Sequence, residues 1–381
     1  MMRILVAPDS FKGSLTAPQV ARAIAKGVAR ACPDCPIQLL PIADGGEGTL
    51  SALLAGTGGH QLPVTVQGPL GGRVTANLGL LPAGTAVVEM AQASGLTLIP
   101  LERRNPLLTS SFGTGQLIKA ALDQGCREII VTIGGSATVD GGLGMLAALG
   151  ARFLDIDGRQ LPPIGEGLPA VAAVDLTDWD HRVDAVSLRI ASDVTNSLCG
   201  PNGAAAVFGP QKGADPEMVV FLDEGLRRFA AVTLQATGMD VLNLPGAGAA
   251  GGVGAALMAY LGGQMQSGVQ VVLDTLQVEQ YLAESDLIFT GEGRMDGQTA
   301  QGKAPIGIAR RGLAYGCRTI ALVGSIASGY EAVYAQGIDA IFPIVNRPMS
   351  LAEAMEQAEE LLQDAAARAM RAFMRFRLPQ S

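Results

Sequence analysis

Short runs of consecutive apolar residues, each followed by glycine and polar residues, recur near both ends of the chain. Such runs are typical of strands that a parallel sheet buries on both faces. They predict strands at residues 3–7, 37–40, 287–289, 319–323 and 340–342. Between these predicted strands, apolar residues recur at helical spacing, for example after Thr16 and from Pro305 to Ala314. The pattern predicts a doubly wound α/β sheet with polar residues at the carboxyl ends of its strands.

The middle of the chain follows a different pattern, which begins near Gly58. From Gln61 to Met90, apolar and polar residues alternate between turn sequences, as is typical of antiparallel strands. Buried strands at 129–133 and 188–191 come later, among helical segments. We therefore expect a Rossmann-like α/β domain built from residues 1–60 and 283–381, an inserted mixed α/β domain at 61–282, and a cleft between them.

The composition narrows the classes of partner. The 381 residues include 50 glycines and carry a net charge of −8 with no basic run, so neither nucleic acid nor an anionic membrane surface is expected to bind. The apolar stretch 241–273 is rich in glycine and alanine, which favours burial in the protein over a membrane span. Cys32 and Cys35 have CxxC spacing without a second pair, so we expect reduced thiols and no zinc site. With no signal peptide recognised, a cytoplasmic protein is expected.

The segment from Ile129 to Gly144 reads IIVTIGGSATVDGGLG and joins a buried strand to a helix of small residues. At its centre, Gly134, Gly135 and Ser136 bring backbone N–H groups close together with little side chain in the way. Backbone N–H groups arranged in this way bind phosphate and other anions. A tight turn without a ligand is the alternative, but glycine-bordered strand ends recur elsewhere in this chain.

Acidic residues recur directly after the predicted strands and beside glycines. Mg²⁺ that carries a nucleotide is held by one or two carboxylates together with phosphate oxygens, so this placement favours Mg²⁺–nucleotide chemistry. For any single residue, an N-cap or turn aspartate is the alternative. The acidic residues in such loops are Asp9, Asp44, Asp140, Asp193, Glu292 and Asp296.

Two lysines also follow predicted strands. Lys12 lies in a hydroxyl-rich loop, where it is either a phosphate or carboxylate clamp or a solvated side chain. Lys303 lies in residues 297–304, which nearly match the GxxxxGK[ST] phosphate loop. Because Ala304 replaces the hydroxyl residue and the segment begins several residues beyond its predicted strand, we expect no true phosphate loop there. Lys303 remains a candidate phosphate contact.

One segment favours a different class of enzyme. Residues 246–251 match the GxGxxG pattern of dinucleotide-binding proteins, and Asp274 follows at nearly the distance expected of a ribose-binding acid. Pro245, however, stands where the preceding strand should end, and glycine-rich sequence matches this pattern easily. An NAD-dependent oxidoreductase of a small hydroxy acid is therefore a remote alternative.

Several long segments, taken together, resemble the glycerate kinases of the type-1 (glycerate 2-kinase) family. They include APDSFKGSLTA (7–17), ADGGEGT (43–49), GGSATVDGG (134–142), NSLCGPNGAAAVFGPQKGA (196–214) and TGEGRMDGQTAQGKAPIGIARR (290–311). The resemblance implies ATP-dependent phosphorylation of D-glycerate to 2-phosphoglycerate with Mg²⁺, in cytoplasmic glyoxylate or sugar-acid metabolism. It also implies a two-domain α/β fold with a discontinuous first domain. Val139 stands where relatives often have asparagine, so its side chain is a poor candidate for an essential role.

The residues support a hypothesis for the site, because phosphoryl transfer depends mainly on alignment and charge neutralisation. Asp193 and Glu292 would hold Mg²⁺ or orient the glycerate hydroxyl, with Asp44 as the third candidate ligand. Lys12, with Ser10, would bind the substrate carboxylate or the γ-phosphate. The full set is Lys12, Asp193 and Glu292 as catalytic residues, Asp9, Ser10, Lys12 and Asp44 for substrate, and Gly134, Gly135, Ser136 and Lys303 for phosphate.

Some questions stay open at this level. Phosphorylation at the 3-hydroxyl is the first alternative, and a sugar-acid sensor without catalysis is another. The sequence does not decide which carboxylate is the base and which binds metal, nor whether the protein is a monomer or a homodimer. Contributions from both domains would imply closure over the substrates, which excludes water.

Overall fold

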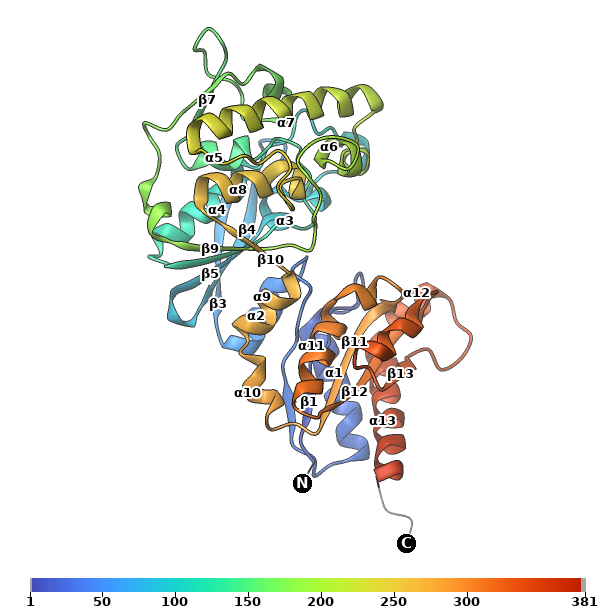
Figure 1. The fold of residues 1–381 in the computed structure, drawn as a ribbon. Coiled ribbons are helices and arrows are strands. Elements are labelled where there is room, and N and C mark those ends of the chain that lie inside the picture. The colour runs from blue at the N-terminus through green and yellow to red at the C-terminus, as the bar shows by residue number, and fades with distance from the viewer. Residues whose placement is uncertain (1, 378–381) are drawn as a thin grey trace. The chain divides into compact units, whose positions relative to one another are not determined.

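The computed structural model describes residues 2–377, which form two compact units. Unit 1 comprises residues 2–44, 51–58 and 269–377, and unit 2 comprises residues 45–50 and 59–268. In Figure 1, unit 1 holds both the blue start and the red end of the chain. The sequence-based boundaries lay at 60/61 and 282/283. Residues 269–282, assigned to the inserted domain from the sequence, pack in unit 1, where Val269 lies against Gly307 on a neighbouring helix.

Unit 1 is built on one five-stranded sheet in the order β13-β12-β11-β1-β2. Every neighbouring pair in this sheet is parallel. The strand runs that the sequence predicted are present, although β11 extends well beyond the predicted end at Phe289. The strands are β1 (Ile4–Val6), β2 (Ile37–Leu39), β11 (Leu287–Met295), β12 (Arg318–Ile326) and β13 (Ala340–Pro343). The doubly wound α/β class is confirmed for this unit.

Helices cover both faces of this sheet, because alternate strand residues point to opposite faces. On one face, Leu322 joins the apolar cluster formed with α1 and α13, and on the other, Val323 joins the cluster formed with α11. Helix α1 lies close against α13 because residue 27 is a glycine: a Cβ there would come within 2.2 Å of the Gln363 carbonyl oxygen. The helices are α1 (Ala17–Ala31), α2 (Thr49–Thr57), α9 (Gly268–Thr275), α10 (Val278–Leu282), α11 (Ala304–Ala314), α12 (Leu351–Glu356) and α13 (Ala358–Arg377).

Unit 2 contains a six-stranded sheet in the order β10-β9-β6-β5-β4-β3. Pairing is antiparallel between β3 and β4 and between β4 and β5, as the alternating pattern predicted. β5 then pairs parallel with β6. This strand is therefore antiparallel to one neighbour, β4, and parallel to the other, β6. The strands of the unit are β3 (His60–Gln67), β4 (Arg73–Leu81), β5 (Thr85–Glu89), β6 (Glu128–Thr132), β7 (Arg152–Leu154), β8 (Ala173–Asp175), β9 (Ser187–Ala191) and β10 (Gln264–Gln266), with β7 and β8 forming a separate two-stranded sheet.

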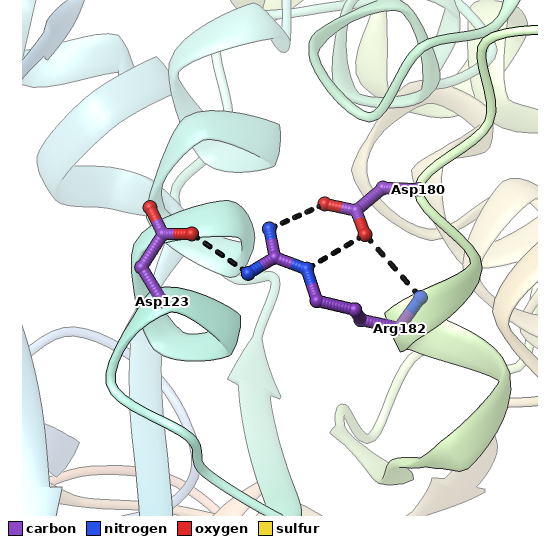
Figure 2. A network of polar contacts seen from close by, with 3 residues as sticks. All are labelled: Asp123, Asp180 and Arg182. Carbon is purple, nitrogen blue, oxygen red and sulfur yellow. Dashed lines mark hydrogen bonds and ion pairs between the residues drawn. The ribbon is translucent and has the colours of Figure 1, made fainter.

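The helices of unit 2 pack around this sheet and share one apolar core with it. At the surface, Arg182 joins two segments: its guanidinium contacts Asp123 at the end of α4 and Asp180, at 2.9 and 2.7 Å (Figure 2). Exposed ion pairs of this kind contribute little stability, so we assign this network a local anchoring role. The helices are α3 (Met90–Ser94), α4 (Phe112–Asp123), α5 (Leu143–Ala148), α6 (Ala204–Phe208), α7 (Pro216–Thr237) and α8 (Val253–Leu261).

Two features of the fold bear on the expectations from composition. Cys32 and Cys35 form a disulfide, whereas the sequence favoured reduced thiols there. The pairing follows from the local turn at the end of α1, where the Cys35 N–H donates to the Cys32 carbonyl and the two Cα atoms lie 5.5 Å apart. Within residues 2–377, no helix is both long and apolar enough to span a bilayer.

Candidate active site

Unit 1 has a pocket of about 450 Å³ at the carboxyl ends of its parallel strands. Open α/β sheets bind their ligands at this edge. The pocket brings together six residues that the sequence singled out, on three segments far apart in the chain. They are Asp9, Ser10, Lys12, Asp44, Glu292 and Lys303.

Asp9 follows β1 in the chain and is buried in this pocket. The Asp9 N–H donates to the Gly291 carbonyl at 2.9 Å, and the Asp9 carboxylate accepts from the Ser10 N–H at 2.6 Å. Burial raises the pKa of Asp9 to about 7, and the nearby negative charge of Asp44 adds to the rise. Asp9 can therefore exchange a proton near neutral pH.

Lys12 and Asp44 lie at the open side of the same pocket. The Lys12 ammonium is 3.9 Å from the Asp44 carboxylate, and 72% of the lysine side chain is exposed. Asp44 is carried there by the chain after β2, where the Ile42 N–H donates to the Pro8 carbonyl at 3.0 Å. Because Lys12 is so exposed, its ammonium group is accessible to an anionic ligand that enters the pocket.

Glu292 lies within β11 and is buried. The Thr299 hydroxyl donates to its carboxylate at 2.6 Å. Burial raises the pKa of Glu292 to about 7, while the Thr299 hydrogen bond and the charge of Lys303 oppose the rise. The sequence predicted Glu292 as a loop residue, whereas the structure fixes it in a strand, which holds the carboxylate more firmly.

The loop from β11 to α11 corrects one expectation. Strand β11 runs to Met295, so the phosphate-loop-like segment 297–304 begins directly after a strand and not several residues beyond one. Lys303 is the N-cap of α11, an 11-residue helix, and it lines the pocket. Ala304 still lacks the metal-binding hydroxyl of a true phosphate loop. A helix N-terminus with a lysine beside it is nevertheless favourable for an anion.

The predicted phosphate loop of unit 2 follows β6, and its glycines are exposed. Gly135 has a φ of 71°, a conformation that side chains other than glycine rarely adopt. Two backbone hydrogen bonds hold the loop, from Leu96 N–H to the Gly135 carbonyl at 2.8 Å and from Ala137 N–H to the Ser94 carbonyl at 2.9 Å. The strand–glycine–helix context predicted from the sequence is present.

Ser136 is bound by a residue that the sequence analysis missed. The Lys212 ammonium is buried and donates to the Ser136 hydroxyl at 2.8 Å and to the Thr138 carbonyl at 2.7 Å. Burial lowers the pKa of Lys212 to about 7, and the charge of Asp140 opposes this. Lys212 lies between Gln211 and Gly213, and it is 76 residues from Ser136 in the sequence, so no local pattern predicted the contact.

Two buried carboxyl groups of unit 2 have structural roles. Asp140 accepts hydrogen bonds from the Ser111 N–H and hydroxyl and from the Gly142 and Gly144 N–H groups, which joins the loop to α5. Glu89, which the sequence analysis did not single out, ends β5 and accepts from the Leu50 N–H at 2.8 Å. Glu89 thus anchors the glycine-rich segment around Gly45–Leu50. The turn-aspartate alternative is the better interpretation of Asp140, because its carboxylate accepts from the N–H two residues later and Gly142 is the N-cap of α5.

Asp193 is exposed and follows β9 in unit 2, as the sequence predicted. Its carboxylate accepts from the Gly268 N–H at 3.3 Å. No group of three or more His, Cys, Asp or Glu side chains in the described part of the chain could hold a metal ion by itself. Since Mg²⁺ usually takes one or two carboxylates and completes its shell with phosphate oxygens and water, the predicted ligands Asp44, Asp193 and Glu292 remain candidates.

The GxGxxG segment does not have the context of a dinucleotide site. Residues 246–251 follow coil rather than a strand, and lead through a 3₁₀ turn into α8. The Gly251 carbonyl accepts from the Gly141 N–H at 3.0 Å, so the segment packs against the loop after β6. Its glycines serve close packing.

Burial of Lys212 predicts a pH-dependent stability. Between about pH 7 and the ordinary lysine pKa near 10.4, the unfolded chain binds a proton that the folded protein does not, so the free energy of unfolding should rise with pH in this window. The maximum slope for one proton is about 1.4 kcal/mol per pH unit. Urea unfolding of Lys212→Met at pH 7.5 and 9.5 should lack this rise, whereas Lys119→Met, at an exposed position of α4, should keep it. Parallel pH dependence in Lys212→Met and the wild type would contradict the assignment.

Comparisons with known proteins show the family of this chain. A family model described as the glycerate kinase family matches residues 4–374. A glycerate kinase of Halalkalibacterium halodurans is 49% identical over 96% of this chain and 97% of its own length. The glycerate 2-kinase of Escherichia coli is 46% identical over 94% of each chain. A crystal structure of a Salmonella typhimurium LT2 protein, 46% identical, superposes with a TM-score of 0.90 over 98% of this chain and 99% of that one.

The fold, the carboxylate and lysine pocket and these matches define the class: the protein is a kinase, which takes ATP as a co-substrate. Within that class, the chain belongs to the glycerate kinase family. The family resemblance and the two-part α/β fold expected from the sequence are thereby confirmed.

Proposed function

We propose that this protein is a glycerate 2-kinase that transfers the γ-phosphoryl group of ATP to the 2-hydroxyl of D-glycerate, with Mg²⁺. The observation that supports this most directly is the unit 1 pocket, where two buried carboxyl groups with pKa values of about 7 lie beside Lys12 and Lys303. The kinase names of the relatives supply the reaction, and the Escherichia coli relative supplies the 2-position. In this role the protein acts in the cytoplasm, in glyoxylate or sugar-acid breakdown.

The pocket offers a base for the glycerate hydroxyl. In the reaction, the hydroxyl oxygen forms a bond to the γ-phosphorus, the bond from that phosphorus to the β–γ bridging oxygen breaks, and the hydroxyl proton passes to a base. We assign the proton to Glu292 or Asp9, since a base with a pKa near the working pH transfers protons efficiently. Thr299 positions Glu292 for this step.

The charged groups of the pocket suit the remaining needs of the reaction. Lys12, with Ser10, would pair with the glycerate carboxylate or the γ-phosphate, and Lys303 with a phosphate. Glu292 and Asp44 present the carboxylate oxygens that Mg²⁺ prefers, and the negative charge of Asp44 contributes to the raised pKa of Glu292 in the same pocket. When bound, Mg²⁺ neutralises phosphate charge. In unit 2, the Gly134, Gly135 and Ser136 loop and Asp193 stay predicted phosphate and metal contacts.

The raised carboxyl pKa values predict a pH dependence of activity. Below about pH 7, Asp9 and Glu292 are protonated and can neither accept a proton nor bind a cation, so kcat/KM should fall at least about tenfold per pH unit below 6.5 and reach a plateau above 7.5. The measurement is initial rate between pH 5.5 and 8.5 by direct detection of ADP. A flat profile down to pH 5.5 would exclude both carboxylates as the base.

One assay tests the proposed function. Purified protein is mixed with ATP, Mg²⁺ and D-glycerate, ADP is quantified, and the position of the new phosphate is read by ³¹P NMR. Release of ADP that requires D-glycerate, with a 2-phosphate product, supports the proposal. A 3-phosphate product would move the acceptor to the other hydroxyl, and glycerate binding without ADP release would make the protein a sensor. Reduction of NAD⁺ by a hydroxy acid would favour the oxidoreductase alternative.

A further inference from the structure

The unit 1 pocket has an apolar half that glycerate does not explain. Its floor is made of the buried side chains of Phe11 and Ile344, and its rim of the exposed side chains of Val345, Leu351 and Met355. Leu351 is 76% exposed, and Val345 and Met355 are 37% and 36% exposed. Glycerate has three carbons that all carry oxygen, so it offers no apolar surface to cover these side chains.

The apolar rim is held in a fixed position. Ser350 and Glu353 form a capping box at the start of α12, with the Ser350 N–H donating to the Glu353 carboxylate at 2.8 Å. At the other end of α12, the Ser14 hydroxyl donates to the Met355 carbonyl at 2.8 Å, which ties the helix to the loop that carries Lys12. The rim is therefore a preformed wall of the same pocket.

We propose that this apolar half binds the adenosine part of ATP, with the phosphates directed toward Lys12 and Lys303. The inference rests on the proposed function, in which ATP is the only substrate with a large planar surface of low polarity. The lining agrees, because it combines these apolar side chains with two lysines, Lys12 and Lys303. An amphiphilic anion matches both kinds of side chain at once.

If adenosine is buried against Leu351, replacing this side chain with a polar one should weaken the binding of nucleotide. Leu351→Ser removes apolar contact area without adding charge, and we expect the Kd for ADP, measured by calorimetry, to rise about fivefold to tenfold. Binding of inorganic tripolyphosphate and the KM for D-glycerate should stay unchanged. Leu351→Met, which keeps an apolar side chain, should bind ADP like the wild type. Leu313→Ser, a change at an exposed position of α11 outside the pocket, is the matched control.

Photolabelling locates the adenine ring of the bound nucleotide without relying on a change in affinity. With 2-azido-ADP, the label should fall on the tryptic peptide of residues 319–368, which contains Val345, Leu351 and Met355, and excess ADP should suppress it. A rise in the glycerate KM with unchanged ADP affinity in Leu351→Ser would overturn the inference, as would label confined to unit 2. If the wild type phosphorylates glycerate and Leu351→Ser binds ADP normally, the inference fails alone. If ADP binds as expected but no acceptor is phosphorylated, the proposed function fails instead.

Discussion

Replacing Glu292 with glutamine should lower kcat about a thousandfold while leaving the fold intact. Glutamine keeps an oxygen that can accept the Thr299 hydroxyl, so the buried hydrogen bond at 2.6 Å is retained. What is lost is the ability to take a proton or to hold a cation, and general base catalysis alone contributes about 10²- to 10⁴-fold. Steady-state rates with saturating ATP and D-glycerate measure the effect, and urea unfolding checks the fold.

Two further variants separate a reacting Glu292 from a structural one. Thr299→Val removes a hydrogen bond that favours the ionised carboxylate, so the pH profile of kcat should shift to higher pH while the plateau is largely kept. Glu331→Gln, an exposed glutamate in the same unit, should leave the rate unchanged. A Glu292→Gln enzyme that retains more than a tenth of the activity would show that Glu292 is neither the base nor an essential metal ligand.

Asp193→Asn is the second change with a large expected effect, because it tests whether unit 2 takes part in the reaction. Asparagine keeps the oxygen that accepts the Gly268 N–H, so the loop after β9 should hold its conformation. Loss of the negative charge should lower kcat by about 10²-fold or more if the carboxylate binds Mg²⁺ or orients the hydroxyl. Steady-state rates over a range of Mg²⁺ concentrations provide the measurement.

The Mg²⁺ dependence distinguishes the two roles of Asp193. A metal ligand predicts that high Mg²⁺ restores part of the rate, whereas an orienting residue predicts no such rescue. Glu224→Gln, at an exposed position of α7, controls for a general change in charge. If Asp193→Asn works at nearly the wild-type rate, the residue leaves the candidate site, and the unit 1 carboxylates are left to bind the metal.

The sequence predicted the pocket residues of unit 1 because their placement follows a general rule. Asp9, Asp44 and Glu292 each lie within or after a strand of the parallel sheet, and the carboxyl ends of parallel strands meet at one sheet edge. Glycines beside these residues supplied the second signal. The sequence pattern therefore contained both the fold class of unit 1 and the grouping of its polar residues.

Other parts of the site depend on contacts that no local pattern encodes. Lys212 meets Ser136 only through tertiary packing, and a lysine in a polar segment has the pattern of a solvated residue. Glu89 lies in a strand with an alternating pattern, and its role depends on Leu50, 39 residues earlier. The apolar rim around Leu351 has the spacing of an ordinary helix start, and only the structure shows that it faces a pocket.

The central position of β1 in the sheet of unit 1 has a consequence for how the protein folds during synthesis. Strand β1 lies between β2 and β11, and its partner Leu287 is separated from Ile4 by more than 280 residues. During synthesis, the chain of unit 2 is thus complete well before the C-terminal half of unit 1 has left the ribosome. Because domains fold as units, we expect unit 2 to fold first, while β1 still lacks β11 as its neighbour on one side. In that interval the nascent chain exposes sheet edges that a chaperone could cover.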